Sequence, residues 1–325
     1  MKKGSVLYVL SILQEYTDSK HPLTYAAIIE KLDKLYNIEL ERKTVARDIG
    51  LLTEKGYNIV KRGNYGVYLA TRTFEEGELL YLIDAIYSSR SIPVKYATDL
   101  VNKLCSDYSI YDKKQYKYLE KLDEDSKTNN KQLFYVIEVL NEAIKQGKKV
   151  EFQYATYGIN KKVEYKYDGK RFKISPYFMV NNHGKYYLVC NYDKYDNLAN
   201  YKIENISNIC ITEEPVRPLK SLPNCENFSV KKYIKEHIYM MSGNSVNATL
   251  KIDSEKRVTD IIEWFGEDLS IYKKSDIIYA NLNVSEDALV YWALQYGEHV
   301  EVIEPLSTRT KIKERLAILN KKYGV

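Results

Sequence analysis

The segment from residue 41 to residue 69 constrains the fold more than any other part of the chain. Val45, Ile49 and Leu52 recur at helical spacing, Gly56 follows, and a short hairpin comes directly after it. A helix with one aliphatic side, closed by a glycine and followed by a hairpin, is the pattern of a winged helix-turn-helix. The first question is therefore which polymer the protein binds.

The opposite side of this helix carries positive charge. Lys43, Arg47 and Gly50 fall away from the aliphatic side, with Thr44 to one side of them. Two cations around a residue without a side chain let a helix lie close in a major groove, where Arg or Lys reaches guanine edges or phosphates. An ordinary solvated helix face is the alternative, and Glu54 on the same side favours it.

The hairpin favours the nucleic-acid interpretation. Residues 58–61 and 66–69 are typical of two short strands around a turn at residues 62–65. A basic hairpin tip can lie along a phosphate backbone or enter a minor groove. We therefore predict that residues 1–72 form a winged helix-turn-helix that binds double-stranded DNA, through Arg42, Lys43, Thr44, Arg47, Lys61 and Arg62.

The rest of the chain divides by periodicity. Residues 73–147 show helical spacing and are expected to form a connector and dimerisation region. Residues 148–218 contain several short alternating segments, which favour a small β-barrel. Residues 219–245 are expected to be a linker, and residues 246–325 follow a βαβ-type pattern of a small α+β domain. The fold class is α+β multidomain.

Charge is distributed unevenly along the chain. The net charge is +5 overall, +3 over residues 1–70, +5 over residues 148–220 and −2 over residues 246–325. Positive first and middle modules suit a polyanionic partner, although swings of this size are common on solvated surfaces. The apolar stretch near the amino terminus is interrupted by polar residues, and no apolar run approaches the roughly 20 residues of a membrane span. We expect a cytoplasmic protein with no membrane partner.

The sequence contains no recognisable metal-binding or catalytic motif. The four cysteines are scattered without CxxC pairing, and none of the four histidines forms a metal-like pair, so we expect no metal site. The patterns GxSxG, GxxxxGK[ST] and HExxH are absent, as is a GxGxxG after a strand. Trp264 and Trp292 sit at helical spacing among aliphatic residues and are expected in a core. We expect neither an enzyme nor a cofactor.

With these blocks in order, nearly the entire chain resembles the WYL-domain transcriptional regulators. The resemblance rests on four segments: RKTVARDIGLL with its hairpin, ISPYFMVNNHGKYYLVCNY, YKIENISNICI and GEHVEVIEPLSTRTKIKERLAILNKKY. Tyr186, Tyr187 and Leu188 stand where Trp-Tyr-Leu would stand. The resemblance implies a winged helix, a helical connector, an Sm-like or SH3-like barrel (the WYL domain) and a ferredoxin-like extension.

The resemblance also implies a dimeric regulator whose barrel senses a ligand, often nucleic acid or a nucleotide. Aromatic and basic residues of adjacent strands would form the ligand face. The residues of this chain that correspond to it are Tyr154, Arg171, Lys173, Tyr177, His183, Tyr187 and Lys202. Tyrosines packed in a core beside ordinary surface lysines are the alternative.

One departure from the family pattern affects the ligand. The family usually places arginines in the strand after the YL segment, where this chain has Ala199 and Asn205. Neither residue can replace a planar, two-pronged guanidinium. Binding of an anionic ligand in the usual place is therefore in question, and the identity of the ligand is open.

Two functions follow from these observations. The first is a homodimeric DNA-binding transcriptional regulator, tuned by a nucleotide or oligonucleotide effector on the WYL domain. The alternative is a non-catalytic accessory protein that binds single-stranded nucleic acid or RNA in a defence or DNA-damage system. A comparison of duplex and single-stranded competitors distinguishes the two.

Overall fold

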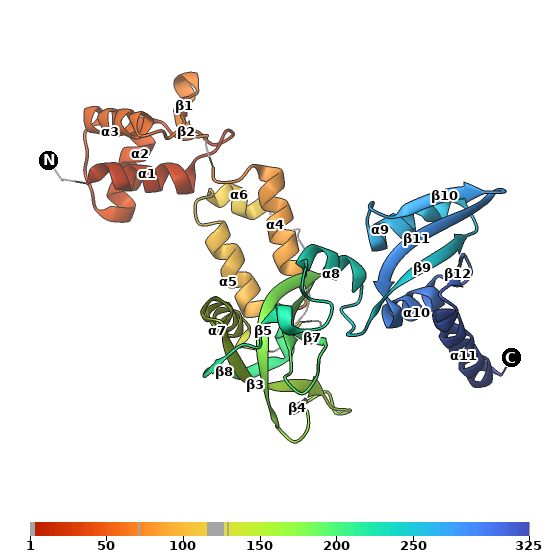
Figure 1. Ribbon diagram of the computed structural model, residues 1–325. Coiled ribbons are helices and arrows are strands. Elements are labelled where there is room, and N and C mark those ends of the chain that lie inside the picture. Colours follow the sequence, from red (N-terminus) through yellow and green to blue (C-terminus); the bar gives the residue numbers. More distant parts are fainter. Residues whose placement is uncertain (1–3, 71, 116–126, 129, 325) are drawn as a thin grey trace. The chain divides into compact units, whose positions relative to one another are not determined.

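The structure is a computed structural model that describes residues 4–70, 72–115, 127–128 and 130–324. The chain divides into two compact units, Met1–Asn129 and Asn130–Val325, and each is described by itself. Figure 1 shows the elements of both.

The first unit opens with three helices followed by a two-stranded hairpin (Figure 1). These elements, residues 5–69, are called the winged fold below, and the hairpin is called the wing. The winged fold consists of α1 (Ser5–Tyr16), α2 (Tyr25–Tyr36), α3 (Arg42–Glu54), β1 (Ile59–Lys61) and β2 (Val67–Leu69). All three helices and β2 contribute to one core, because each turns an apolar stripe inward. That core consists of Val9, Ile12, Leu13, Ile28, Leu32, Ile38, Val45, Ile49, Leu52, Val67 and Leu69.

Local signals explain where these elements begin and turn. The Thr24 side chain accepts a hydrogen bond from the Ala27 amide at 3.2 Å and so caps the start of α2. Leu23 forms an isolated antiparallel bridge with Val67, so the chain before α2 is held against β2 of the wing. The two amides and carbonyls of this bridge exchange hydrogen bonds at 2.9 and 2.8 Å.

Helices follow the winged fold, as predicted for the connector. They are α4 (Glu76–Ser88), α5 (Val94–Leu104) and the unpredicted α6 (Ile110–Gln115). Glu75 and Glu78 form a capping box at the start of α4. Most of the polar stretch at residues 123–130, whose composition is typical of a loop, lies outside the described residues.

The second unit begins with α7 (Leu133–Gln146), which ends at Gly147 in a left-handed conformation with φ of 63°. Six strands follow: β3 (Lys148–Tyr157), β4 (Val163–Tyr165), β5 (Arg171–Asn182), β6 (Lys185–Asn191), β7 (Leu198–Lys202) and β8 (Ile206–Pro215). The pairing runs β4-β3-β5-β6-β7, and β8 pairs with β3.

This pairing corrects the predicted barrel. Among the described strands β7 and β8 do not pair, so the sheet stays open. The chain passes from β7 to β8 through a one-turn 3₁₀ helix at Ile203–Asn205, which interrupts strand geometry where closure would need it. Alternating short segments predict strands well, but they do not predict whether the last strand meets the first.

The predicted linker contains a helix, and the carboxyl-terminal elements follow it. α8 (Val230–Glu236) packs the Tyr233 ring against Val180, Tyr187 and Val189 of β5 and β6. The final elements are β9 (Ser245–Ile252), α9 (Val258–Phe265), β10 (Ser270–Lys274), β11 (Ile277–Ser285), α10 (Glu286–Gln295), β12 (Val300–Glu304) and α11 (Leu306–Tyr323).

The four carboxyl-terminal strands form an antiparallel sheet in the order β10-β11-β9-β12. With one helix after β9 and one after β11, this is the connectivity of a ferredoxin-like sheet. α9 and α10 cover one face, where Trp292 is fully buried, in agreement with its predicted core position. Trp264 is partly buried at the edge of the same core and donates to the Tyr296 hydroxyl at 2.8 Å.

Candidate nucleic-acid interface and effector pocket

Helix α3 separates an apolar side from a polar side along its length. Val45 and Ile49 are buried, whereas Lys43, Arg47 and Gly50 are exposed. Because 3.6 residues make a turn, Lys43 and Arg47 lie one turn apart on the outward side. The two cations can therefore contact the same partner.

A buried carboxylate fixes the orientation of α3. Asp48 is 2% exposed and accepts a hydrogen bond from the Ser5 hydroxyl at the start of α1. It also accepts one from Nη2 of Arg47 at 3.2 Å. Sequence reasoning missed Asp48, although it lies three residues after Val45 and so on the same side of the helix. The Ser5 contact ties α3 to α1, and the Arg47 contact pairs that guanidinium with the buried Asp48 carboxylate through one nitrogen.

The first turn of α3 suits an anion. Glu41 is the N-cap residue, but neither its side chain nor any acidic side chain of the first turn satisfies the helix amides. Arg42 and Lys43 occupy this turn instead, and the Arg42 guanidinium lies 5.9 Å from the Tyr25 ring. The helix dipole is positive at this end, so the cations are disfavoured there unless an anion such as phosphate binds.

The wing presents fewer cations than its sequence predicts. Arg62 donates from Nη1 to the Ser19 carbonyl at 2.6 Å, so its guanidinium is turned back onto the body of the domain. Lys61 remains exposed on β1. Tyr65, which is 73% exposed, stands on the 3₁₀ turn between the strands and was not predicted.

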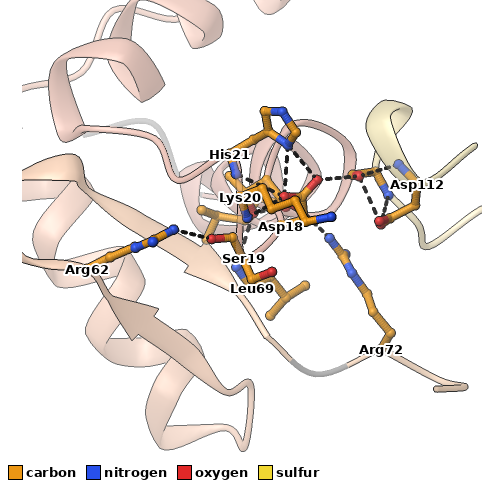
Figure 2. A network of polar contacts seen from close by, with 11 residues as sticks. Asp18, Ser19, Lys20, His21, Arg62, Leu69, Arg72 and Asp112 are labelled. Atoms are coloured by element: carbon orange, nitrogen blue, oxygen red, sulfur yellow. Dashed lines mark hydrogen bonds and ion pairs between the residues drawn. The ribbon is translucent and has the colours of Figure 1, made fainter. Parts of the chain in front are cut away.

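A polar network joins the winged fold to the helical connector (Figure 2). Asp18 accepts hydrogen bonds from the Lys20 and His21 amides, from the His21 ring at 2.9 Å and from the Ser109 hydroxyl at 3.2 Å. Burial raises the pKa of Asp18, but the hydrogen bonds from His21 and Lys20 outweigh it and leave the pKa lowered. The His21 ring also stacks on Tyr111 at 3.7 Å.

Arg72 forms the second half of this network. Its guanidinium donates to the Thr17 carbonyl after α1 and, at 2.8 Å, to the Asp107 carbonyl before α6. Burial lowers the pKa of Arg72, and the nearby Asp112 and Asp18 carboxylates oppose that shift. One arginine therefore ties the end of α1 to the connector, beside the wing.

The structure does not bring the predicted ligand residues of the WYL region together. Tyr187 pairs with Lys202 across β6 and β7, whereas Leu188 pairs with Tyr201. Successive side chains of a strand point to opposite faces, so Tyr187 and Lys202 share one face and Tyr201 lies on the other. Tyr154 packs edge-on against Tyr201 at 5.1 Å, on the side opposite to Tyr187.

The other predicted ligand residues have structural partners. The Arg171 guanidinium donates to the Asn208 carbonyl at 2.9 Å, and Lys173 pairs with Glu214 at 2.5 Å. Tyr177 is buried and donates to the Arg217 carbonyl at 2.7 Å; burial raises the pKa of Tyr177 to about 12.

His183 also lies apart from the other predicted ligand residues. It occupies the turn between β5 and β6 with φ of 47°. Its ring packs against Trp264 at 4.9 Å. Its environment is therefore the carboxyl-terminal domain rather than the tyrosines of the sheet.

A pocket of about 450 Å³ lies on the Tyr201 face instead. Its walls are aromatic and its rim carries two lysines, a combination that suits a flat, anionic ligand. The lining residues are Tyr167, Lys170, Phe172, Tyr192, Lys194, Tyr195, Asn197, Ala199 and Tyr201. None of the predicted ligand residues is among them. Alternation along β7 places Tyr201 and Ala199 on one face and Lys202 on the other. This alternation is the sequence signal that could have indicated the pocket residues.

The two departures from the family pattern have different consequences. Ala199 lines the pocket, so its methyl group leaves room that an arginine would fill. The Asn205 side chain instead reaches the Tyr154 hydroxyl at 3.4 Å, and that hydroxyl also accepts from the Lys202 amide at 3.2 Å. Burial raises the pKa of Tyr154, and these two hydrogen bonds oppose the rise.

No helix within residues 4–70, 72–115 and 130–324 combines the length and apolar character that a membrane crossing requires. The same described residues contain no group of three or more His, Cys, Asp or Glu arranged to hold a metal ion.

Comparison with known families identifies two domains. Residues 135–211 match the WYL domain, and residues 244–318 match the WCX domain. The uncharacterized HTH-type transcriptional regulator YobV of Bacillus subtilis (strain 168) is 38% identical over 63 residues, which are 19% of this chain and 20% of that protein. These matches support a place in the WYL-domain transcriptional regulator family.

Two solved structures show weaker likeness. Proteasome accessory factor B/C (PafBC) of Arthrobacter aurescens is 12% identical, with 95% of this chain and 47% of that chain covered at a TM-score of 0.30. A CRISPR Cas-related protein is 15% identical, with 98% of this chain and 84% of that chain covered at a TM-score of 0.39. At these TM-scores neither structure informs the function of this chain.

Proposed function

We propose that this protein is a homodimeric transcriptional regulator that binds duplex DNA through α3 and the wing. The observation that carries the proposal is the exposed pair Lys43 and Arg47, one turn apart on a helix whose other side is buried in a winged fold. Such a helix enters a major groove with its basic side chains toward base edges and phosphates.

The six predicted residues take different roles in this proposal. Lys43, Thr44 and Arg47 reach base edges or neighbouring phosphates, and Gly50 allows close approach of the helix. Arg42 contributes to a phosphate site at the amino-terminal end of α3. Lys61 contacts the backbone from the wing. Arg62 acts indirectly, because it fixes the wing to Ser19.

The same proposal assigns effector sensing to the aromatic pocket of the WYL domain. Tyrosine rings stack on bases without strong sequence preference, and lysines neutralise phosphate. Tyr192 and Tyr195 lie 5.9 Å apart at the mouth, with Lys194 over the Tyr195 ring at 5.7 Å. A nucleotide or a short single strand fits this lining better than an apolar metabolite does.

The test of the DNA-binding role is a titration of duplex fragments selected from a genomic pool. We expect Arg47→Ala to weaken binding roughly 10- to 100-fold and to reduce the salt slope by about one. Lys95→Ala removes an exposed cation of α5, outside the winged fold, and should leave affinity within about twofold. Equal affinities for Arg47→Ala and the unmodified protein would rule out the proposed surface.

The accessory role remains the competing function because of the tyrosine- and lysine-lined pocket. It predicts that a single-stranded competitor displaces a bound single strand, and that duplex of the same length does not. It also predicts that loss of pocket tyrosines costs more affinity than Arg47→Ala. The opposite order supports the regulator.

A further inference from the structure

Helix α11 carries an apolar stripe that its own domain does not cover. The helix spans Leu306–Tyr323, yet Thr308 is its one buried residue within the described range. Every described residue from 313 onward is exposed, and Figure 1 shows α11 running out beyond the sheet of its domain. The uncovered part, residues 313–323, is shorter than the roughly 12–15 residues that an isolated helix needs in water, so packing against a partner would stabilise it.

The stripe is narrow and well defined. At 3.6 residues per turn, Ile312, Leu316, Leu319 and Tyr323 fall within an arc of about 60°. Ile312 still packs against the core of the carboxyl-terminal domain, while Leu316, Leu319 and Tyr323 are 46, 37 and 81% exposed. The spacing of four, three and four residues is that of a coiled-coil seam.

Cations flank the stripe on both sides. Lys313 and Asn320 stand along one edge, and Arg315 and Lys322 along the other. The whole helix contains six Lys or Arg and one Glu. Flanking charges of this kind decide which partner a seam accepts. Two copies of α11 would repel each other, so the partner carries acidic residues beside an apolar centre.

Helix α4 has the complementary surface. Residues 73–89 contain four acidic side chains and no Lys or Arg. Tyr81 is 77% exposed at the centre of the outer face, with Asp84 toward one edge and Glu78 toward the other. Gly77, Ala85 and Ser88 share this face, and small residues let a second helix approach closely.

We propose that α11 of one copy packs on α4 of a second copy and so forms the dimer. Leu316, Leu319 and Tyr323 would surround Tyr81, and the basic edges of α11 would meet Asp84 and Glu78. Both faces are open on the single chain. The inference specifies the interface of the proposed homodimer, and it does not depend on DNA binding.

The test is the dimer dissociation constant of the full chain, measured by sedimentation over a concentration series without DNA. Leu319→Ser and Lys322→Glu lie on the stripe and its edge, and each should raise the constant at least about tenfold. Their neighbours provide matched controls. Ile318→Ser and Lys321→Glu replace an aliphatic residue and a lysine on other sides of the helix and should leave the constant within about twofold.

Charge exchange identifies the partner surface. Asp84→Lys should weaken the unmodified dimer, and in combination with Lys322→Glu it should restore most of the lost affinity. Helical content by circular dichroism checks that each variant folds. A monomer at all concentrations, equal effects of the stripe and control changes, or a double variant without recovery would each overturn the proposal. DNA binding of a monomer to one half-site would survive any of these results.

Discussion

Gly66 shows how one residue determines the geometry of the wing. Its φ is 116°, a left-handed conformation that residues with a side chain rarely adopt. A Cβ built there would meet the backbone carbonyl oxygen of Leu23 at 2.0 Å. That carbonyl accepts a hydrogen bond from the Val67 amide, in the bridge between Leu23 and the wing. Glycine is therefore required both by the backbone angle and by the close approach.

Gly66→Ala should destabilise the first unit by about 1–3 kcal/mol, because strain of this kind cannot relax without breaking the bridge. Thermal unfolding should show the transition several degrees lower. Gly50→Ala is the control: Gly50 is exposed, helical and without a neighbour within 4 Å of the added Cβ. That change should stabilise the helix by about 0.5–1 kcal/mol. Equal transition temperatures for both variants would contradict the role of Gly66.

Residue-level prediction from the sequence succeeded where neighbours along the chain decide the outcome. Periodicity within one helix separates Val45 and Ile49 from Lys43 and Arg47, and the burial of these residues agrees. Tyr187 could not be placed in the same way. Alternation shows that it faces away from Tyr201, but α8 covers its face, and α8 lies more than 40 residues later in the chain.

At the scale of elements, the Asp18 network holds the winged fold to the connector. Asp18→Asn removes the charge that the Lys20 and His21 amides and the His21 ring stabilise. Hydrogen bonds to a charged group contribute about 1.5–3 kcal/mol, so we expect a loss of about 2 kcal/mol in the free energy of unfolding at pH 7. Asp33→Asn, at an exposed carboxylate of α2, should change it by less than about 0.5 kcal/mol.

The difference in the free energy of unfolding between the unmodified protein and Asp18→Asn should depend on pH with a definite sign. The folded pKa of Asp18 lies below the ordinary value of 3.8, so its contribution is complete above that value. The contribution of Asp18 to stability is lost as the pH falls through the lowered pKa, because the Asp18 carboxylate then becomes protonated in the folded state as well as in the unfolded state. Chemical denaturation at pH 7, 4 and 3 should show the unmodified protein approaching Asp18→Asn. A difference that stayed constant over this range would contradict the assignment.

Elements were predictable where both ends carry local signals. The helical spacing of Val45, Ile49 and Leu52 and the glycine that follows predict α3, and the helix spans Arg42–Glu54. α8 and β10 were missed, because seven- and five-residue elements carry too few periods to stand out. The open sheet of the WYL region was mistaken for a barrel, since closure depends on which strands pair rather than on the character of each strand.

At the scale of the whole molecule, positive charge and aromatic surface occur in separate modules. The winged fold presents a basic helix, and the WYL region presents an aromatic pocket with a lysine rim. One module can therefore bind duplex DNA while another binds a different ligand. An effector changes the affinity for DNA only if it binds the two states of the protein unequally, and the DNA must then change the affinity for the effector by the same factor.

Ala199→Trp tests this coupling because it fills the pocket from β7 and leaves the residues of α3 unchanged. With a 5′-phosphorylated mixed-sequence tetranucleotide as the probe, calorimetry should show at least a tenfold loss of probe affinity. Duplex affinity without the probe should stay within about twofold. The change in duplex affinity that the probe causes in the unmodified protein should disappear.

A pair of exposed tyrosines separates stacking in the pocket from general surface effects. Tyr195 lines the pocket and is 53% exposed, whereas Tyr157 is 56% exposed and lies outside it. Loss of one stacked base costs about 1–3 kcal/mol, so Tyr195→Ala should weaken probe binding roughly 5- to 150-fold. Tyr157→Ala should not change it. If both tyrosine variants and Ala199→Trp bind the probe as the unmodified protein does, the pocket is not the effector site, because stacking there contributes nothing to recognition.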